Sequence, residues 1–242
     1  MTGVVALSRL EVRRALRNRR VMFFTVLYPA ILFLLIGSSS KGTLGGVDTK
    51  TYILISMATF GALSGAMTNN AQKIAAERKE GWTRQLRLTA LPPNGYVIGK
   101  VVSAAMLIIP AIIIVFAVGA ATGVHLGANK WLLAFVLIWV TSLSFTALGI
   151  AIGYGFPSDV VQMVTLITYF GLSIVGGLWI PITGGVMQKV ADFTPTYQVR
   201  QMTTNLVTGQ SISAVGGLVL AVWLVGSVVI ASLVYRRGGS DN

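Results

Sequence analysis

Residues 101–129, VVSAAMLIIPAIIIVFAVGAATGVHLGAN, contain no Asp, Glu, Lys or Arg. A helix needs about 20 residues to cross the roughly 30 Å hydrocarbon layer of a bilayer, so this stretch is long enough to span it. Five further stretches have the same property: 21–40, 51–72, 131–158, 160–188 and 201–235. Six charge-free stretches of this length predict an integral membrane protein.

The composition supports the same fold class. Hydrophobic residues make up 54% of the chain, charged residues only 11%, and the mean hydropathy is +0.76. An ordinary soluble domain has about 25% charged residues. Strict strand alternation is absent, and backbone groups in lipid must be satisfied within each segment, so helices fit these stretches. We therefore predict one all-α domain over 1–242, a six-helix membrane bundle with helical cores at 21–37, 52–71, 100–122, 131–153, 160–180 and 214–235.

Several classes of site are excluded by residue counts. The chain has no cysteine and a single histidine, His125, which excludes disulfides, thiol catalysis and a histidine-rich metal site. The first apolar stretch follows a basic segment and lacks a small-residue cleavage pattern, so we expect a retained helix rather than a signal peptide. The net charge of +12 reflects basic membrane flanks rather than nucleic-acid binding, because aromatic residues are not interleaved with the basic ones.

The distribution of Lys and Arg predicts the orientation. With the N-terminus inside, fourteen of the 19 basic residues lie on the inner side and five on the outer side. Positive charge accumulates on the cytoplasmic side of membrane proteins, so both termini are expected in the cytoplasm. The inner set is Arg9, Arg13, Arg14, Arg17, Arg19, Arg20, Lys73, Arg78, Lys79, Arg84, Arg87, Lys100, Arg236 and Arg237.

Small residues and prolines mark positions within the spans. Glycine pairs four residues apart, at 61/65, 119/123 and 149/153, would allow helix backbones to approach closely, although 27 glycines make some pairs accidental. Pro29 and Pro110 lie inside spans and are expected to kink them.

Residues 1–20 form a basic segment that precedes the first span. On a helix, Val4, Val5, Val12, Ala15 and Leu16 share one arc, whereas the opposite arc is basic and contains Arg9, Arg13, Arg17 and Arg20. The residues assigned to the interfacial helix are Arg9, Arg13, Arg14 and Arg17. This pattern predicts an amphipathic helix lying in the inner membrane interface. A basic flank that only fixes the topology is the alternative.

Residues 72–99 form the longest inner loop. Gly81 can end a helix that extends from the second span, and a short helix over 83–90 would then be stopped by Pro92 and Pro93. Trp82 and Leu86 line one side of this short helix, which makes it suitable for docking a cytoplasmic partner. A solvated connector is the alternative.

Residues 181–213, between the last two spans, are too apolar for a free loop and too broken to span. We expect short outer helices at 187–193 and 197–207, separated by Pro195 and packed on the outer rim of the bundle. A simple surface cap is the alternative.

These segments together resemble the membrane-spanning subunit of ABC-2-type ABC transporters, in particular the daunorubicin-type drug-efflux branch. The most specific part is ERKEGWTRQLRLTALP at 77–92, which is similar to the family's E-R-E-G stretch and is followed by Gly99–Lys100. Trp82 stands where the family usually has Thr or Ser. A second match is Gly176–Pro181 followed by Thr194–Pro195. The residues that carry these matches are Glu77, Arg78, Glu80, Gly81, Trp82, Leu86 and Pro92, and Gly176, Gly177, Pro181 and Pro195.

The resemblance implies a partner and a mechanism. Two permease subunits, as a homodimer or heterodimer in the lipid membrane, would form the pathway above two copies of an ATPase subunit. ATP and Mg²⁺ would be bound by the ATPase subunits, and this chain would hold no cofactor of its own. The loop around 77–91 would dock in the ATPase and transmit its closure to the helices.

Other function classes are weaker. Residues 93–101 do not form a phosphate loop, because Gly95 and Gly99 are one residue too close and Val101 is not Ser or Thr. An ion-coupled transporter usually needs Asp, Glu, His or Arg within the bundle, and the predicted spans contain none of these. Ion coordination by backbone carbonyls and by Ser or Thr stays open. A membrane hydrolase would need convergent acid–base pairs. A non-transporting scaffold or sensor subunit shares all the features above.

A charge-free bundle suits an apolar or amphipathic cargo. Four residues of the later spans are the expected lining of a pathway for drugs, antibiotics or natural products: Phe145, Met163, Tyr169 and Phe170. Lipids and lipid-linked glycans are the alternative cargo, and packing against helices or lipid is the alternative role of each side chain. Export as the direction follows from the resemblance alone.

Overall fold

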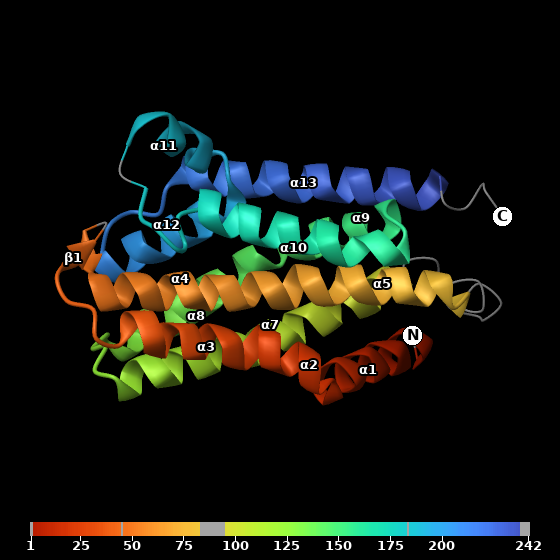
Figure 1. The fold of residues 1–242 in the computed structure, drawn as a ribbon, viewed down its shortest axis with the longest axis horizontal. Helices are drawn as coiled ribbons and strands as arrows, with labels where there is room; N and C mark the ends of the chain where they lie inside the picture. Colours follow the sequence, from red (N-terminus) through yellow and green to blue (C-terminus); the bar gives the residue numbers. More distant parts are fainter. Residues whose placement is uncertain (1, 45, 83–94, 183, 238–242) are drawn as a thin grey trace.

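The computed structural model describes residues 2–44, 46–82, 95–182 and 184–237, which form an elongated bundle of helices (Figure 1). Six helical stretches are long and apolar enough to cross a membrane, which confirms the predicted fold class. The first span comprises α2 (Arg19–Met22), η1 (Phe23–Leu27), α3 (Tyr28–Leu32) and η2 (Phe33–Gly37), and the second comprises α4 (Thr49–Leu63), η3 (Ser64–Thr68) and α5 (Asn69–Lys79). The others are α7 (Gly95–Ala121), α8 with α9 (Ala128–Ser142, Ser144–Gly155), α10 (Ser158–Val175) and α13 (Ala214–Arg237).

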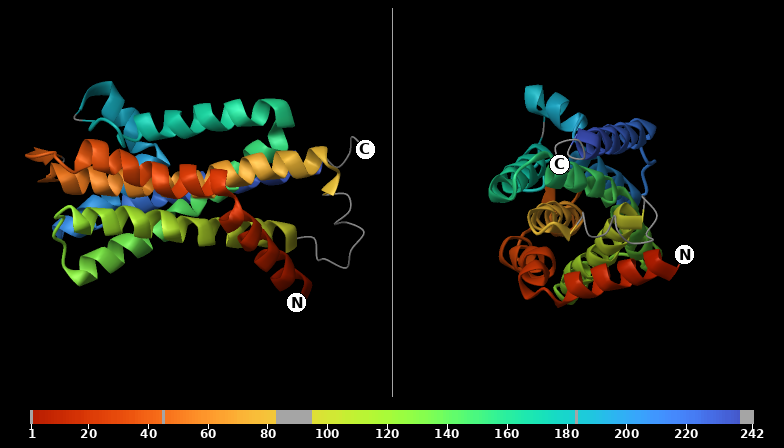
Figure 2. Two further views of the ribbon diagram at one scale, coloured as in Figure 1. Left: turned by 60° about the horizontal axis from the view of Figure 1, so that its bottom comes forward. Right: turned by 90° about the vertical axis from the view of Figure 1, so that its right-hand side faces the viewer.

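The remaining elements lie at the two ends of the bundle. Helix α1 (Thr2–Arg17) lies obliquely at the end where α13 also finishes (Figures 1 and 2). We call this the basic end. The opposite end carries a β-hairpin of two short strands, β1 (Thr43–Leu44) and β2 (Val47–Asp48). It also carries the helices α11 (Gly185–Asp192) and α12 (Pro195–Thr208). Both outer helices agree with the prediction, whereas the hairpin was not predicted.

The second span is the centre of the bundle (Figure 2). In its most apolar stretch 89% of the residues are buried, against 22% for α10 and 17% for α13. Phe60 of α4 contacts four aromatic rings, among them Tyr169 of α10 at 4.5 Å and Trp179 at 5.1 Å between centroids. A helix surrounded in this way is buried on every face, whereas the exposed side chains of α10 and α13 face lipid or a partner.

Local sequence signals account for several helix boundaries. The Asn18 side chain accepts hydrogen bonds from the backbone N–H groups of Arg20 and Val21, so it separates α1 from the first span as an N-cap. The Asp48 carboxylate accepts one from the Thr51 N–H at 3.3 Å and begins α4. At Pro29 the chain adopts the wide π-helical turn η1 just before the proline, since proline lacks an N–H and crowds the preceding turn.

Three predicted span limits are corrected by the structure. The helix of the second span continues to Lys79 rather than ending at 71, in agreement with the prediction that Gly81 ends it. The third span begins at Gly95 rather than at 100. The fifth ends at Val175 rather than 180, because Gly177 adopts a left-handed conformation with φ +70°. Charged residues mark where apolar composition ends, and helices continue beyond them.

Helix α1 is not divided into the two arcs that the sequence suggested. Its buried side includes Ser8, Glu11 and Ala15 and faces α7, whereas Val5 and Leu16 are exposed. The predicted apolar arc is therefore wrong in part, because Glu11 finds cationic partners inside the bundle. The predicted exposure of the arginines holds: Arg9, Arg13, Arg14 and Arg17 all lie on the surface. The interfacial position of α1 stays a prediction.

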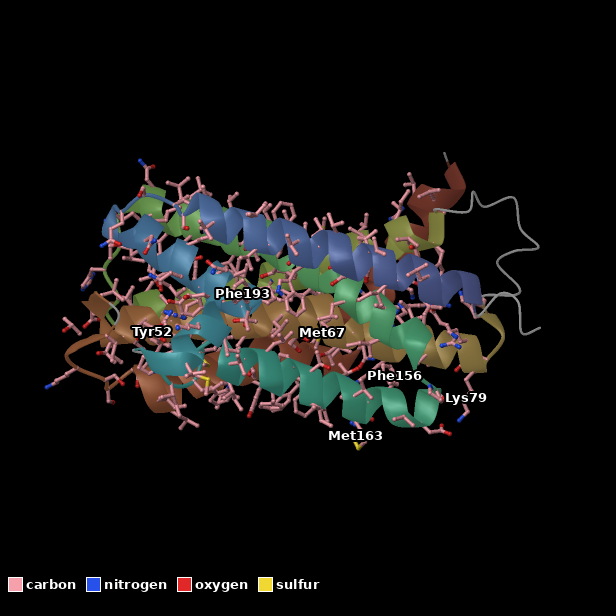
Figure 3. All side chains as sticks on the ribbon, turned by 90° about the horizontal axis from the view of Figure 1, so that it is seen from above. Tyr52, Met67, Lys79, Phe156, Met163 and Phe193 are labelled. Carbon is pink, nitrogen blue, oxygen red and sulfur yellow. The ribbon has the colours of Figure 1, made fainter. Side chains whose placement is uncertain are left out.

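Two of the three glycine pairs form close contacts between spans. A Cβ on Gly149 would lie 2.5 Å from the Met67 carbonyl oxygen, and one on Gly153 would lie 2.9 Å from the Ala71 oxygen. Met67 lies near the middle of the bundle (Figure 3). On the other side of the second span, Gly61 lies against the ring of Pro29. In the pair 119/123 only Gly119 makes a close contact, with the Leu54 side chain, because Gly123 lies beyond the end of α7.

The close approach of α9 to the second span predicts the effect of one added methyl group. Gly149→Ala should destabilise the protein by about 1–3 kcal/mol, since the new Cβ overlaps the backbone of Met67. Thermal unfolding of the purified protein in detergent measures this. Gly171→Ala in α10 is the matched control, because no described atom lies within 4 Å of the added carbon. Equal melting temperatures for the two variants would contradict the contact.

Candidate functional site

Five side chains meet at the basic end, where α1, α5 and α7 come together. The Lys100 Nζ donates hydrogen bonds to both carboxylate oxygens of Glu77, at 2.9 and 2.7 Å, and to Glu11 Oε2 at 3.2 Å. The Lys73 Nζ donates to the same Glu11 oxygen at 2.6 Å, and the Tyr96 hydroxyl donates to Glu77 Oε2 at 2.6 Å. We call these five residues the ion cluster.

The ion cluster is removed from solvent. Glu11 and Lys100 are each 1% exposed and Glu77 is 7% exposed. Burying a charge costs several kcal/mol, and this cost is offset only when partners and hydrogen bonds are well placed. Two carboxylates face two ammonium groups here, so the charges balance. Each member of the cluster therefore depends on the others being present.

The Glu11 carboxylate is held in its charged form. Burial raises its pKa, but Lys100 and Lys73 act in the opposite direction and leave the pKa below its ordinary value. Glu11 is the only acidic residue of α1. The single acid of this basic helix is therefore an ionised anchor that fastens α1 to the bundle.

The ion cluster lies on both sides of the predicted docking loop. Helix α5 ends at Lys79, Gly81 turns the chain with φ +71°, and α7 begins at Gly95. We call residues 80–94 the connecting segment. Since Glu77 precedes it and Lys100 follows it, their ion pair closes the base of the segment and joins both of its ends to α1.

A second contact joins the start of the connecting segment to α1. The Arg14 guanidinium carbon lies 5.6 Å from the ring centroid of Trp82. A cation over a tryptophan face contributes roughly 0.5–1 kcal/mol at a partly exposed site. Trp82 is therefore placed beside the N-terminal helix, and the face it shares with Arg14 lies at the surface of the basic end.

Arg78 and Lys79 attach the end of α5 to the turn between α9 and α10. The Arg78 Nη1 donates to the carbonyl oxygens of Tyr154 at 2.6 Å and Gly153 at 3.1 Å, which lack helical partners at the end of α9. Lys79 forms an exposed ion pair with Asp159 at 3.2 Å. Lys79 and Phe156 accordingly lie near one another at the basic end in Figure 3.

The structure separates the residues expected to dock a partner. Glu77 points into the bundle and belongs to the ion cluster, so its side chain is not available as a surface contact. Glu80 is exposed, and Trp82 is half-buried beside Arg14. Leu86 and Pro92 lie outside the described residues. Arg78 is exposed but its guanidinium is engaged with α9.

A groove of about 470 Å³ lies between the first, second and fifth spans. Two of the predicted pathway residues, Tyr169 and Phe170, line it, and polar groups from the three spans share the lining. We call it the polar groove; its polar residues are Asn18, Arg20, Thr25, Ser64, Thr68, Asn69, Gln72 and Gln162. The Tyr169 hydroxyl donates to the Phe60 carbonyl oxygen at 3.2 Å, which fixes the ring at the floor of the groove.

The other two predicted pathway residues lie elsewhere. Phe145 of α9 is 1% exposed and packs in the hydrophobic core. Met163 of α10 is 59% exposed and points away from the bundle (Figure 3). Phe145 and Met163 therefore do not share the groove with Tyr169 and Phe170, because the rotation of α9 and α10 about their axes carries them to other faces. The pathway role of the four residues stays a prediction.

The outer segment is held by backbone contacts at the predicted glycines and prolines. The Thr196 hydroxyl donates to the Leu172 carbonyl at 2.5 Å and occupies the space where Gly176 would carry a Cβ. The Tyr52 hydroxyl of α4 donates to the Gly177 carbonyl at 2.7 Å. Pro195 occupies the first turn of α12, and Pro181 lies in the non-helical stretch before α11.

Arg200 of α12 is buried at this outer end. Its guanidinium lies 4.8 Å from the ring centroids of both Tyr52 and Tyr197. Burial lowers the pKa of Arg200, and the two tyrosines oppose this shift. Arg200 is one of the five basic residues that the sequence predicts on the outer side, and the structure shows it as a cation–π contact between α12 and α4.

Comparison with known proteins places this architecture in a family. Residues 45–235 match the model of the family described as ABC-2 family transporter protein. The chain belongs to the ABC-2 transporter family. It is also 22% identical over 231 residues to the protein named "Putative transport permease YvfS" of Bacillus subtilis (strain 168), with 94% of each chain covered.

The ABC-2 match includes four members of the ion cluster and leaves out α1, which contributes Glu11. Sequence reasoning treated Lys73 and Lys100 as topology charges, and it did not single out Glu11 or Tyr96. A signal was present in the sequence: Glu11 is the lone acid of an arginine-rich helix, and Lys100 lies one helical turn after Tyr96 at the edge of a charge-free stretch. These positions of Glu11 and Lys100 are unusual for charged side chains that only face water.

The ion cluster predicts a strongly non-additive response to mutation. Glu77→Gln or Lys100→Met alone should destabilise this ABC-2 chain by about 3–5 kcal/mol, because each leaves a buried charge without its partner. The double variant should lose less than the sum of the single losses. Denaturant unfolding of the three variants measures the coupling. Lys79→Gln is the control, since its exposed pair with Asp159 contributes at most about 1 kcal/mol.

The lowered pKa of Glu11 predicts a pH dependence of stability. A carboxyl whose folded pKa lies below its unfolded value stabilises the fold above the unfolded pKa, and this stabilisation disappears as the pH falls through the folded pKa. The free energy of unfolding should therefore fall as the pH is lowered below the ordinary value of 4.5. Glu11→Gln should be less stable at neutral pH and should show a shallower fall; identical pH profiles would contradict the ionised anchor.

Proposed function

We propose that this chain is the membrane-spanning subunit of an ATP-driven ABC exporter, with ATP and Mg²⁺ bound by a separate ATPase subunit. Membership of the ABC-2 transporter family over residues 45–235 is the observation that carries the proposal. In this assembly two copies of the ATPase serve two permease subunits, which are identical or related. Both termini then lie in the cytoplasm, where the basic end faces the ATPase across the prokaryotic plasma membrane.

The connecting segment is the proposed docking element. Its start is exposed at Glu80, turns at Gly81 and carries Trp82 against α1. The ion cluster supports this role, because it joins both ends of the segment to α1 and to the central span. A displacement of the segment would then move α1, α5 and α7 together, and switching between inward and outward access would need differential contacts of the ATPase in the two states.

The polar groove is the proposed part of the pathway, with Tyr169 and Phe170 in its lining. Ring faces beside amide and hydroxyl groups suit an amphipathic cargo such as a drug, antibiotic or natural product. Lipid or lipid-linked polysaccharide has the same amphipathic character and is the alternative cargo. The large exposed fraction of α10 supports a second permease packing against this side of the bundle.

An ion-coupled transporter is the second candidate, and one observation favours it. Glu77 and Lys100 lie within helices that are long enough to span, and ionisable groups at such positions mark proton relays in many transporters. Their complete pairing in the ion cluster favours a structural role instead, since a relay must release its proton during the cycle.

Reconstitution into vesicles separates the two candidates. We expect transport of an amphipathic fluorescent substrate only when the ATPase subunit that co-purifies from native membranes, ATP and Mg²⁺ are present. A soluble phosphate-loop ATPase should be recovered at about one per permease copy. Transport by this chain alone, driven by a proton gradient and abolished by Glu77→Gln, would replace the exporter proposal with an ion-coupled mechanism.

Docking through the connecting segment predicts a coupling defect without loss of the fold. Trp82→Ala should lower the substrate-stimulated ATPase rate of the assembly roughly tenfold, equivalent to ~1.4 kcal/mol of coupling, and should leave the melting temperature nearly unchanged. Gly81→Pro should have a larger effect because proline cannot adopt φ +71°. Lys79→Gln serves as the surface control. Normal coupling in a correctly inserted Trp82→Ala variant would contradict the docking role.

A further inference from the structure

A second groove, of about 520 Å³, lies at the basic end on another side of the bundle. Its floor is α9, with Ala147 and Ile150, together with Leu143 just before this helix. Its walls are the start of α7 and the C-terminal half of α13. Wall residues Val101 and Val228 are 37% and 50% exposed, whereas the floor residue Ala147 is 8% exposed. The groove is therefore open towards the membrane and closed towards the bundle. We call it the apolar groove.

The chemistry of the lining is almost entirely that of hydrocarbon. The lining comes from Tyr96, Val97, Ile98, Val101, Leu143, Thr146, Ala147, Ile150, Tyr154, Leu224, Val228, Ala231 and Ser232. Two of its hydroxyls are already used: Tyr96 donates to Glu77, and Ser232 donates to the Val229 carbonyl. A polar ligand would find few hydrogen-bond partners along such walls, whereas an apolar chain has no hydrogen bonds to lose when it enters the groove.

The length of the apolar groove corresponds to one leaflet. Its floor runs from Leu143 to Tyr154, which is about 16 Å along the axis at ~1.5 Å per residue. This is roughly half of the ~30 Å hydrocarbon layer. Leu143 lies at the break between α8 and α9, so the groove begins near the middle of the membrane span and reaches its basic end.

Positive charge surrounds the basic end of the apolar groove. The Arg78 guanidinium carbon lies 5.7 Å from the ring centroid of Tyr154, a lining residue. Helix α13, which forms one wall, ends with Arg236 and Arg237. Basic residues at the membrane surface attract anionic headgroups, each contributing about 1 kcal/mol.

We propose that the apolar groove is a binding site for an anionic phospholipid, with one acyl chain between α7 and α13 and the headgroup phosphate at the basic end. The wall residues contact the acyl chain, and the positive charge of the basic end complements the headgroup phosphate. Because the chain fills space that neighbouring helices leave open, the bound lipid acts as a packing element between α7, α9 and α13.

A helix of a second copy fits the apolar groove less well. One turn of helix is about 5.4 Å long and at least ~10 Å across, so a groove of this volume holds little more than a single turn. An acyl chain is narrow enough to follow the full leaflet depth. The basic rim also complements a phosphate and would repel the equally basic end of another copy.

Native mass spectrometry of the delipidated full chain in detergent tests the site. The probes are phosphatidylglycerol and phosphatidylcholine with the same palmitoyl and oleoyl chains. We expect one saturable adduct that favours phosphatidylglycerol at least fivefold. Ala231→Phe, which fills the groove from α13, should weaken this adduct at least tenfold. Ala221→Phe, exposed on the same helix outside the groove, should leave it unchanged.

Two further variants complete the test. Val101→Trp fills the groove from α7 and should reproduce the loss if Ala231→Phe does not fold. The double variant Arg236→Gln and Arg237→Gln should keep the adduct but remove most of the preference for the anionic headgroup. Equal binding by Ala231→Phe and Ala221→Phe, or a change of oligomeric state in Ala231→Phe, would overturn the proposal. The assay uses neither the ATPase nor a transported substrate, so its failure is distinct from failure of the proposed function.

Discussion

A charged lysine buried inside a membrane bundle constrains the rest of this structure. Lys100 has its ammonium group 1% exposed, so it requires carboxylates at hydrogen-bond distance, and these come from two different helices. Glu77 is reached only because the second span continues as a helix through α5. Glu11 is reached only because α1 folds back across α7. One desolvated ammonium thus determines the length of one helix and the direction of another.

The sequence predicts the spans well because their signal is one-dimensional. Crossing a bilayer requires about 20 apolar residues in succession, and six such runs are visible without any knowledge of contacts. The ends of the helices were less predictable. Gly81 indicated a helix that extends from the second span through Lys73 and Glu77, but nothing in the sequence indicated that α1 and α7 satisfy their charges. Hydropathy alone cannot anticipate a partner that is distant in sequence.

The residues of the polar groove and of the ion cluster were predicted less completely than the spans, and the physical reason differs between the two sites. In lipid, both the core and the exterior of the bundle are apolar, so composition does not reveal which face of a span points inwards. Phe145 and Met163 were grouped with Tyr169 and Phe170 on composition, and the helix rotations separated them. Gly149 and Gly153 could be read correctly, since only the smallest residues permit backbones to touch. The cluster member Glu11 was visible as an oddity but had no predictable partner.

The central span brings the two grooves and the ion cluster into one mechanical unit. Asn69 and Gln72 of this span line the polar groove, and Glu77, little more than one turn further, holds the hydroxyl of Tyr96 in the wall of the apolar groove. A force applied at the connecting segment reaches α5 and α7 first, because the segment joins these two helices. A displacement of α5 would therefore alter both grooves at once, so the lipid seated in one groove would oppose or favour the opening of the other. Coupling of this kind needs no separate pathway, because α5 lines the polar groove and binds Tyr96, a wall residue of the apolar groove.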